Sequence, residues 1–391
     1  MTPPAPALFT DPLSIVTILM IAVALSDWLA RRGIGRQIGA AVIVIAAGAA
    51  LTNLRIIPPA GGGGPAYDPI FSIVLPGSIF LILLEVNLKA LRRAGGSMLG
   101  AFALGALGTC LGVLLAARLV PLAPMIGDQA GPLGGMLTGT YIGGSVNFNA
   151  VALGYGVLRD SATYTTAVVV DNVMTDVWIL VTLMIPGILY RTGRFGAPKP
   201  RVAPHELANR TAPVPLPSTL ALGIPLALAG VALTVSNAAS AALAGLEIAV
   251  PSILIITTLA LLIAQLPAIE RLTFANTLGL WGIFLFLAVV GASADLAALA
   301  ASRTLGAAMF AYIAIIFVVH GIVLIGIGLW LRIEPEIIAI ASNANIGGSA
   351  SAFVLAETQQ RHDLVLPAIL VGSLGNAIGT YAGFAIVPLL A

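Results

Sequence analysis

The residues best suited to bind an ion lie in one apolar segment, 161–190, which contains Asp171-Asn172 and then Thr175-Asp176. Residues four apart share a helix face, so Asp171 lines up with Thr175, and Asn172 lines up with Asp176. A carboxylate within an apolar span costs about 2.5–3.5 kcal/mol to insert, which makes a functional role the first expectation. The cluster therefore predicts a site for sodium or a proton, which compete for a buried carboxylate. The alternative is that Asp171 only pairs with a nearby polar break in the backbone.

Two polar, glycine-rich stretches, 138–149 and 342–351, interrupt apolar segments, and both contain Ile-Gly-Gly-Ser. Such a break at membrane depth is costly unless the freed backbone groups face a cavity, an ion or another protein segment. Carbonyls freed by unwinding can coordinate a cation, while the N-termini of half-helices favour an anion. The alternative is close helix packing, because small residues also line the interfaces between membrane helices.

These residue types predict two groups of ligands and no catalytic group. The coupling cation, with sodium placed at Asp171, Asn172 and Asn147, is expected to meet the oxygen-bearing residues Thr140, Asn147, Asn149, Asp171, Asn172, Thr175 and Asp176. The solute is expected to meet Gly143, Gly144, Ser145, Asn343, Asn345, Gly347, Gly348, Ser349, Ser351 and Asn376. The sequence contains no P-loop, no His-Glu-x-x-His and no evident pair of nucleophile and base, so we expect neither an enzyme nor a soluble cofactor.

The two breaks belong to an internal repeat with an offset of 204 residues. The offset separates Ile142 from Ile346 at the head of the motifs, and it separates Asn172 from Asn376 in the following segment. Paired interruptions at matching places in two halves indicate the binding site of a transporter. The predicted organisation is a first transmembrane repeat at 1–190, a polar basic linker at 191–216 and a second transmembrane repeat at 217–391.

Composition places the chain in the membrane. Of its 391 residues 59% are hydrophobic and 9% are charged, whereas soluble domains carry about 25% charged residues. About twelve apolar segments are long enough to be candidate spans, so we predict an all-α integral membrane protein with about 11–13 transmembrane helices. The formal charge of +2 gives no reason to expect a nucleic-acid partner.

The order of the segments conflicts with one simple topology. Inverted repeats require an odd number of spans between equivalent points, but the offset of 204 residues covers six predicted segments. Either one segment is re-entrant, split or not spanning, or the repeats are parallel.

The motifs at 139–148 and 344–349, together with Asp171-Asn172, resemble the YjcL-like family of bacterial integral membrane proteins, a domain of unknown function. That family is remotely similar to bile-acid:sodium symporters, glutamate:sodium symporters and sodium/proton antiporters. The resemblance implies a panel domain that moves against a core domain, with two broken helices that cross near the membrane midplane. It also implies a multi-pass protein of the bacterial inner membrane, and it is compatible with a homodimer.

Together these features predict a secondary active transporter, a sodium- or proton-coupled symporter of a small carboxylate-bearing solute such as an organic acid, amino acid or short peptide. The alternative is a monovalent cation/proton antiporter that uses Asp171 and Asp176 and needs no organic solute. A third class, a membrane protein that transports nothing, predicts that Asp171→Asn leaves function intact.

Overall fold

The computed structural model of the chain describes residues 7–32, 40–60, 64–191, 195, 218–248, 250–269, 272, 274–293 and 303–390. All regular elements in these ranges are helical, as the composition predicts. The first half contains α1 (Pro12–Ala30), α3 (Ala40–Asn53), α4 (Leu75–Leu83), α5 (Gly96–Leu119), α6 (Ala123–Ile126), α7 (Ala130–Gly143), α8 (Ser145–Gly154) and α9 (Ser161–Arg191). The second half contains α10 (Thr219–Ala244), α11 (Ser252–Ile263), α12 (Ala275–Ser293), α14 (Arg303–Trp330), α15 (Pro335–Ile346), α16 (Gly348–Thr358) and α17 (Val365–Ile386).

Seven of the described helices are long and apolar enough to cross a membrane, namely α1, α5, α9, α10, α12, α14 and α17. An eighth span results if the bent pair Ile70–Leu83 and Leu88–Ala94, which meet at 49°, is counted as one. The number is lower than the predicted 11–13. The apolar helices α3 and α11 are short, with 14 and 12 residues, and both glycine-rich segments divide into two short helices.

Local sequence signals fix the starts of two spans. Asp11 accepts a hydrogen bond from the backbone N–H of Ser14 at 2.8 Å, and Pro12 occupies the first helical position of α1. Ser218 accepts from the N–H of Ala221 at 3.1 Å and so caps α10. Both arrangements satisfy backbone donors that a helix leaves without an internal partner.

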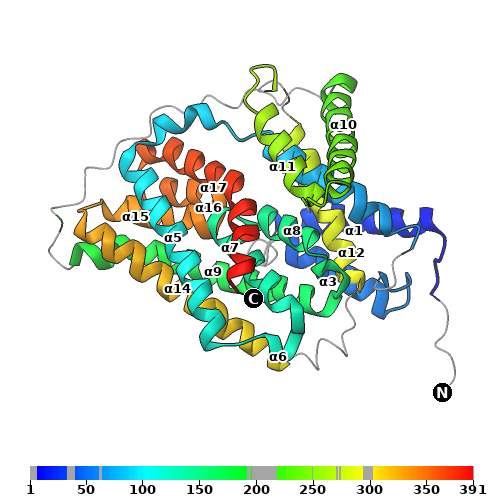
Figure 1. Cartoon of the computed structure of the whole chain (residues 1–391), viewed down its shortest axis with the longest axis horizontal. Helices are drawn as coiled ribbons and strands as arrows, with labels where there is room; N and C mark the ends of the chain where they lie inside the picture. Colours follow the sequence, from blue (N-terminus) through cyan, green and yellow to red (C-terminus); the bar gives the residue numbers. More distant parts are fainter. Residues whose placement is uncertain are drawn as a thin grey trace.

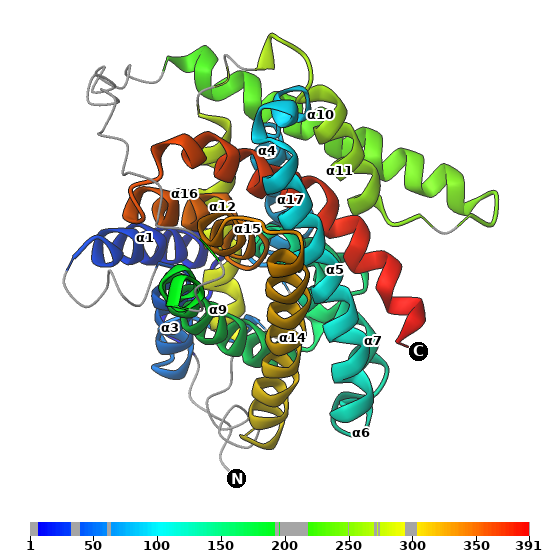
Figure 2. The same ribbon diagram turned by 90° about the vertical axis from the view of Figure 1, so that its left-hand side faces the viewer.

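The helices pack most closely within two sets, and each set draws on both halves of the chain. The first set is α1, α3, α4, α10, α11 and α12, which lie on the right in Figure 1. The second set is α5, α7, α8, α9, α14, α15, α16 and α17, most of which face the viewer in Figure 2. Glycine permits the closest contacts: a Cβ on Gly291 of α12 would overlap the backbone of Ile45 in α3, and one on Gly112 of α5 would lie 2.8 Å from the Cα of Ile316 in α14.

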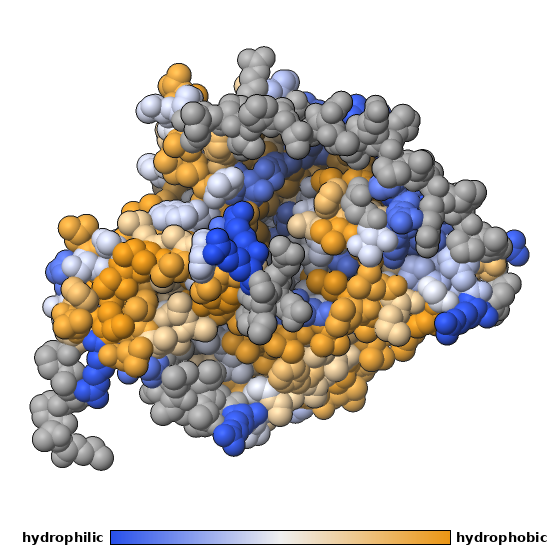
Figure 3. Space-filling model, turned by 180° about the vertical axis from the view of Figure 1, so that it is seen from behind, coloured by the Kyte–Doolittle hydropathy of each residue, from blue (hydrophilic) through white to orange (hydrophobic). Residues whose placement is uncertain are grey.

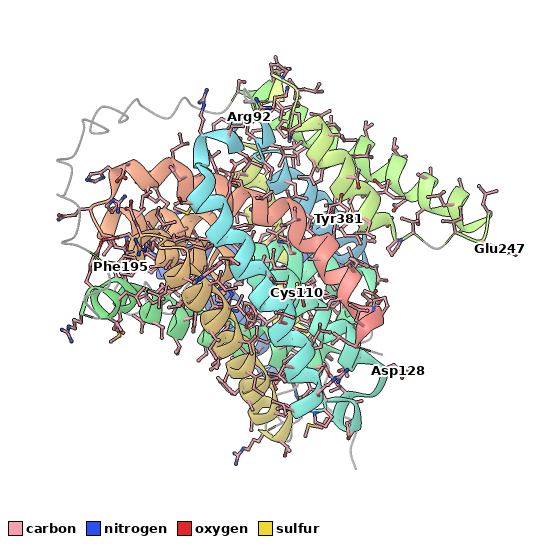
Figure 4. All side chains as sticks on the ribbon, turned by 60° about the vertical axis from the view of Figure 1, so that its left-hand side comes forward. Arg92, Cys110, Asp128, Phe195, Glu247 and Tyr381 are labelled. Carbon is pink, nitrogen blue, oxygen red and sulfur yellow. The ribbon has the colours of Figure 1, made fainter. Side chains whose placement is uncertain are left out.

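The outer surface has the character of a protein that sits in lipid. Hydrophobic side chains cover much of the face seen in Figure 3, and many large apolar residues of α1, α9, α10 and α14 are exposed. The α10–α11 pair projects from the rest of the molecule, with Glu247 at its tip in Figure 4. The predicted linker at 191–216 lies almost entirely outside the described residues, so the division into repeats at that point stays a prediction.

Candidate functional site

The first glycine-rich segment is a helical hairpin, α7 followed by α8, which we call hairpin 1. A Cβ on Gly139 would lie 3.1 Å from the Cβ of Asn147, and a Cβ on Gly135 would lie 3.3 Å from Val151. In one continuous helix these pairs would be about 12 and 24 Å apart along the axis. The chain therefore reverses at Gly144, whose φ of +97° is readily adopted only by glycine.

The second segment, α15 followed by α16, also folds back and is called hairpin 2. The break lies at Gly348, which has a φ of +80°. Arg361 follows α16 and pairs with Glu334, which precedes α15, at 3.0 Å. A continuous helix would separate these residues by about 40 Å. The two predicted breaks are present, but each reverses the chain where crossing helices were expected.

Helix α17 lies along both hairpins (Figure 1), and its glycines permit backbone contact. A Cβ on Gly375 would overlap the Ile142 carbonyl of hairpin 1 and lie 2.7 Å from the Cα of Gly143. A Cβ on Gly372 would overlap the backbone of Ser349 in hairpin 2. Because these two glycines are one helical turn apart, the ends of both hairpins are held at the middle of α17.

The two tips meet at this point. A Cβ on Gly144 would lie 3.9 Å from the Cα of Gly348 and 3.8 Å from Oδ1 of Asn376. Ser145 is exposed, while Asn376 and Ser349 are half-buried. The N-termini of α8 and α16 therefore come together beside polar side chains, and helix N-termini favour negatively charged groups.

Three of the asparagine and hydroxyl candidates are bonded within the fold. Asn147 accepts from the Thr380 hydroxyl at 2.8 Å and donates to the Gly375 carbonyl at 3.4 Å. Asn149 accepts from the hydroxyl of Tyr164. Asn172 donates to the carbonyl of Val168 in its own helix at 2.7 Å. The amide oxygens of Asn147 and Asn149 are therefore already engaged within the fold, whereas the bond of Asn172 engages only its nitrogen.

Asp171 has the opposite character. It is only 7% exposed, and neither its Oδ1 nor the hydroxyl of Tyr141 has a hydrogen-bond partner among the described residues. The polar side chains of Tyr141 in hairpin 1 and Thr175 in α9 influence its carboxyl group electrostatically, and the exposed Asp176 adds a second negative charge. Asp171 thus provides a buried carboxylate with binding capacity to spare, close to hairpin 1.

The remaining candidates are distributed over the two hairpins. Thr140 is buried in α7, and Gly347 is half-buried at the end of α15. Asn345 is buried, and its amide nitrogen can donate to the carbonyls of Ala341 at 3.1 Å and Phe102 at 3.3 Å. The structure brings Gly143, Gly144, Gly348, Ser349 and Asn376 together at the tips, with Asn343 and Ser351 inside hairpin 2.

A buried chain of hydrogen bonds supports this region. Trp178 donates to the Ser342 hydroxyl at 2.9 Å, which lies 2.9 Å from Nε2 of His320. Nδ1 of His320 lies 3.1 Å from the Thr109 hydroxyl, which donates to the carbonyl of Tyr141 at 3.1 Å. Donors and acceptors match throughout if neutral His320 carries its proton on Nδ1. The chain joins α5, α7, α9, α14 and α15, and it gives His320 a structural role.

A charged cluster closes the base of hairpin 2. Arg361 is 5% exposed and binds Asp363 at 2.7 Å, Glu334 at 3.0 Å and Glu336 at 3.6 Å. Tyr190 at the end of α9 donates to both oxygens of Glu336, at 3.0 and 2.9 Å. The hydrogen bond to Asp363 raises the pKa of Arg361 above its usual value, so the cluster keeps its central charge at all ordinary pH values.

Sequence reasoning missed Tyr141, Trp178 and Thr182. A signal was present for two of them, because Asp171, Trp178 and Thr182 lie seven and eleven residues apart and share one face of α9. That face is directed at the hairpins, since Trp178 bonds to Ser342 and Thr182 accepts from Asn343.

The sequence comparisons agree with this architecture of membrane helices. The profile described as "Protein of unknown function (DUF819)" matches residues 17–391. The chain belongs to the DUF819 family. It is 29% identical over 361 residues to a protein described as "Uncharacterized membrane protein YjcL" from Bacillus subtilis (strain 168), and the match covers 88% of each chain. As a member of this family, the chain is a multi-pass membrane protein.

Proposed function

We propose that this DUF819 protein is a secondary active transporter, a symporter that couples a sodium ion or a proton to a small carboxylate-bearing organic solute. The observation that carries the proposal is the meeting of two helical hairpins, tip to tip, at the middle of α17. Broken helices of this kind place polar backbone at membrane depth, where it is stable only if it lines a cavity or is covered by protein. Paired breaks in two repeats are typical of the substrate site of a transporter.

The fold-back also supports inverted repeats. If the hairpins do not cross the membrane, each half contributes five candidate crossings once the short helices α3 and α11 are included. These are α1, α3, the bent pair around α4, α5 and α9 in the first half, and α10, α11, α12, α14 and α17 in the second. An odd number of crossings inverts the second half relative to the first, which removes the conflict met in the sequence.

The two packing sets fit a panel and a core. The first three crossings of each half form the set without hairpins, and the remaining elements form the set that holds both. Contacts between the sets include a hydrogen bond of 2.7 Å between Thr258 of α11 and Tyr381 of α17, and an edge contact between the rings of Tyr164 and Phe286. In the proposed mechanism the hairpin set moves past the other set and exposes the tips to each side in turn.

The residues divide into two roles at the proposed site. Gly144, Ser145, Gly348, Ser349 and Asn376 at the tips would receive the carboxylate of the solute, because two helix N-termini point there. Asp171, with Tyr141 and Thr175, would supply the negative charge that makes binding of a coupling cation favourable.

A ligand screen tests the proposal. The detergent-purified protein is heated with acetate, pyruvate, succinate, citrate, glutamate, alanine or dialanine, each in sodium and in potassium and at two pH values. A solute that binds only the folded protein raises the midpoint of thermal unfolding by mass action. At a concentration a hundredfold above its Kd, it adds about 2.7 kcal/mol to the free energy of unfolding. We expect at least one member to do so, and to do so more strongly with the coupling ion present.

Two results would count against symport. A flat response to every solute under all conditions contradicts the tip site. Movement of protons driven by a sodium gradient in proteoliposomes without any solute favours the antiporter, with Asp171 as the exchanging carboxylate.

A further inference from the structure

The side chain of Asn343 is held in one orientation inside hairpin 2. Asn343 is 1% exposed, and its Nδ2 donates to the hydroxyl oxygen of Thr182 at 3.1 Å. The Thr182 hydroxyl gives its own hydrogen to the Ile179 carbonyl at 2.7 Å, so towards Asn343 it can only accept. The amide therefore cannot be turned around, and Oδ1 of Asn343 is directed away from Thr182.

That oxygen has no hydrogen-bond partner among the described residues, although it is closed off from solvent. A buried acceptor left in this state costs about 1–3 kcal/mol, so it calls for a ligand or another compensation. The atom faces the break of the hairpin. A Cβ on Gly347 would lie 2.8 Å from Asn343 Oδ1 and would also overlap the Ser351 hydroxyl. The space that a side chain at position 347 would fill is therefore lined by two oxygens.

Two features of the chain beside this space favour a cation. The Ser351 hydroxyl donates to the Gly348 carbonyl at 3.1 Å, which leaves its own lone pairs free to bind a cation. Helix α15 ends at Ile346, and the last carbonyls of a helix carry its partial negative charge. A set of neutral oxygens at a helix C-terminus suits a hard cation of single charge.

Hairpin 1 provides an internal comparison. With the offset of 204 residues, Gly139 of hairpin 1 corresponds to Asn343, and Asn147 corresponds to Ser351. The buried asparagine therefore lies on the second arm of hairpin 1 but on the first arm of hairpin 2. Both ends of the Asn147 amide are bonded within the protein, through Thr380 and the carbonyl of Gly375. The amide of hairpin 1 is thus bonded at both ends to α17, whereas the amide of hairpin 2 retains an unpaired oxygen.

We propose that hairpin 2 binds one sodium ion between Asn343 Oδ1, Ser351 Oγ and carbonyl oxygens at the end of α15. The inference rests on the proposed transporter function and deepens it, because it names sodium as the coupling ion and places its ligands on hairpin 2, while Asp171 on α9 supplies negative charge and not a ligand. Bound sodium would fix the tip of hairpin 2 against α17 and so prepare the neighbouring solute site.

The test is a sodium titration of the full chain in detergent, with potassium as the comparison ion and choline chloride added to keep ionic strength constant. The thermal midpoint is read for wild type, Ser351→Ala and Gly347→Ala, of which the second places a methyl group in the proposed ion space. Gly326→Ala is the matched control, since a Cβ there meets nothing within 4 Å. We expect sodium, but not potassium, to raise the thermal midpoint of wild type and of the control. Both test variants are expected to require at least about tenfold more sodium for the same rise.

Ser236→Ala, at a buried hydroxyl of α10 that bonds only within its own helix, separates an effect on the ion from a general loss of a buried polar group. It is expected to lower the midpoint at every sodium concentration while the sodium requirement stays that of wild type. Asn343→Ala is expected to raise the requirement, and Ser351→Ala carries the test if that variant does not fold.

Three outcomes would overturn the inference. The first is a wild-type sodium requirement in both Ser351→Ala and Gly347→Ala. The second is a sodium response that only Asp171→Asn removes, which would place the ion on α9 and leave the transporter proposal standing. The third is no sodium response in wild type; proton-driven solute uptake by the same preparation would then show that transport stands and only the sodium site has failed.

Discussion

The contact between hairpin 1 and α17 can be tested with a single methyl group. In Gly375→Ala the added Cβ would overlap the Ile142 carbonyl and lie 2.7 Å from the Cα of Gly143. Carbon atoms in good contact are about 3.5–4.0 Å apart, so hairpin 1 would have to withdraw by about 1 Å. The opposing atoms are backbone, and no side-chain rotation can relieve the overlap.

The expected cost follows from this geometry. Overpacking by one methyl group costs about 1–3 kcal/mol, while alanine in place of glycine within a helix returns about 1 kcal/mol. Gly326→Ala has the gain in helix propensity without the overpacking cost, because the space around Gly326 is open. Gly375→Ala should therefore be less stable than Gly326→Ala by about 1–3 kcal/mol.

Unfolding of the purified protein in mixed micelles with rising sodium dodecyl sulfate measures this difference as a free energy. Gly187→Ala in α9, where a Cβ also meets nothing within 4 Å, serves as a second control. Equal stability of Gly375→Ala and both controls, within about 0.5 kcal/mol, would refute the backbone contact between hairpin 1 and α17 and with it the placement of the tips.

Three further predictions concern the groups around the hairpins. Asp171→Asn should keep or raise the unfolding midpoint of the ligand-free protein, since it removes a buried charge with an unpaired oxygen. It should also abolish ion-coupled solute uptake. Normal uptake by the variant would contradict the role proposed for Asp171. Arg361→Gln should lower the free energy of unfolding by about 2–4 kcal/mol, after allowance for the partial exposure of Glu334 and Asp363. The loss should be the same throughout the neutral pH range, because pairing keeps Arg361 charged in the native state. A loss below about 0.5 kcal/mol would contradict the buried cluster. Ser342→Ala should lower the free energy of unfolding by about 1–3 kcal/mol and change the fluorescence emission of Trp178, since it deprives the indole and His320 of a partner. The control Ser236→Ala removes a bond of 2.6 Å within a single helix and should cost less. Equal effects of the two variants would refute the buried chain of hydrogen bonds.

The sequence was sufficient to predict the helical class, the membrane setting and the positions of both breaks. It could not distinguish a kinked helix from a reversal, because glycine at a positive φ serves either geometry, as Gly144 and Gly348 show. The deciding feature lies in α17, where Gly372, Gly375 and Gly379 share one face and allow the hairpins to approach.

The candidate site was predicted in part, for a similar reason. Asp171 and the tip glycines follow from the cost of polar groups at membrane depth, which is a local argument. The state of each amide depends on distant partners, and these are not visible in one sequence. Asn147 is bonded to Thr380, 233 positions away, whereas Asn343 bonds at only one end of its amide.

The measurement that tests the central claim most directly is solute accumulation in proteoliposomes. The solute that stabilises the purified protein is supplied outside, with a sodium gradient, a pH gradient or no gradient, for wild type and Asp171→Asn. Symport at the hairpin tips predicts accumulation above equilibrium only with a gradient of the coupling ion, and none in the variant. Equal distribution of solute under every gradient, with folded wild-type protein in the membrane, would contradict the account.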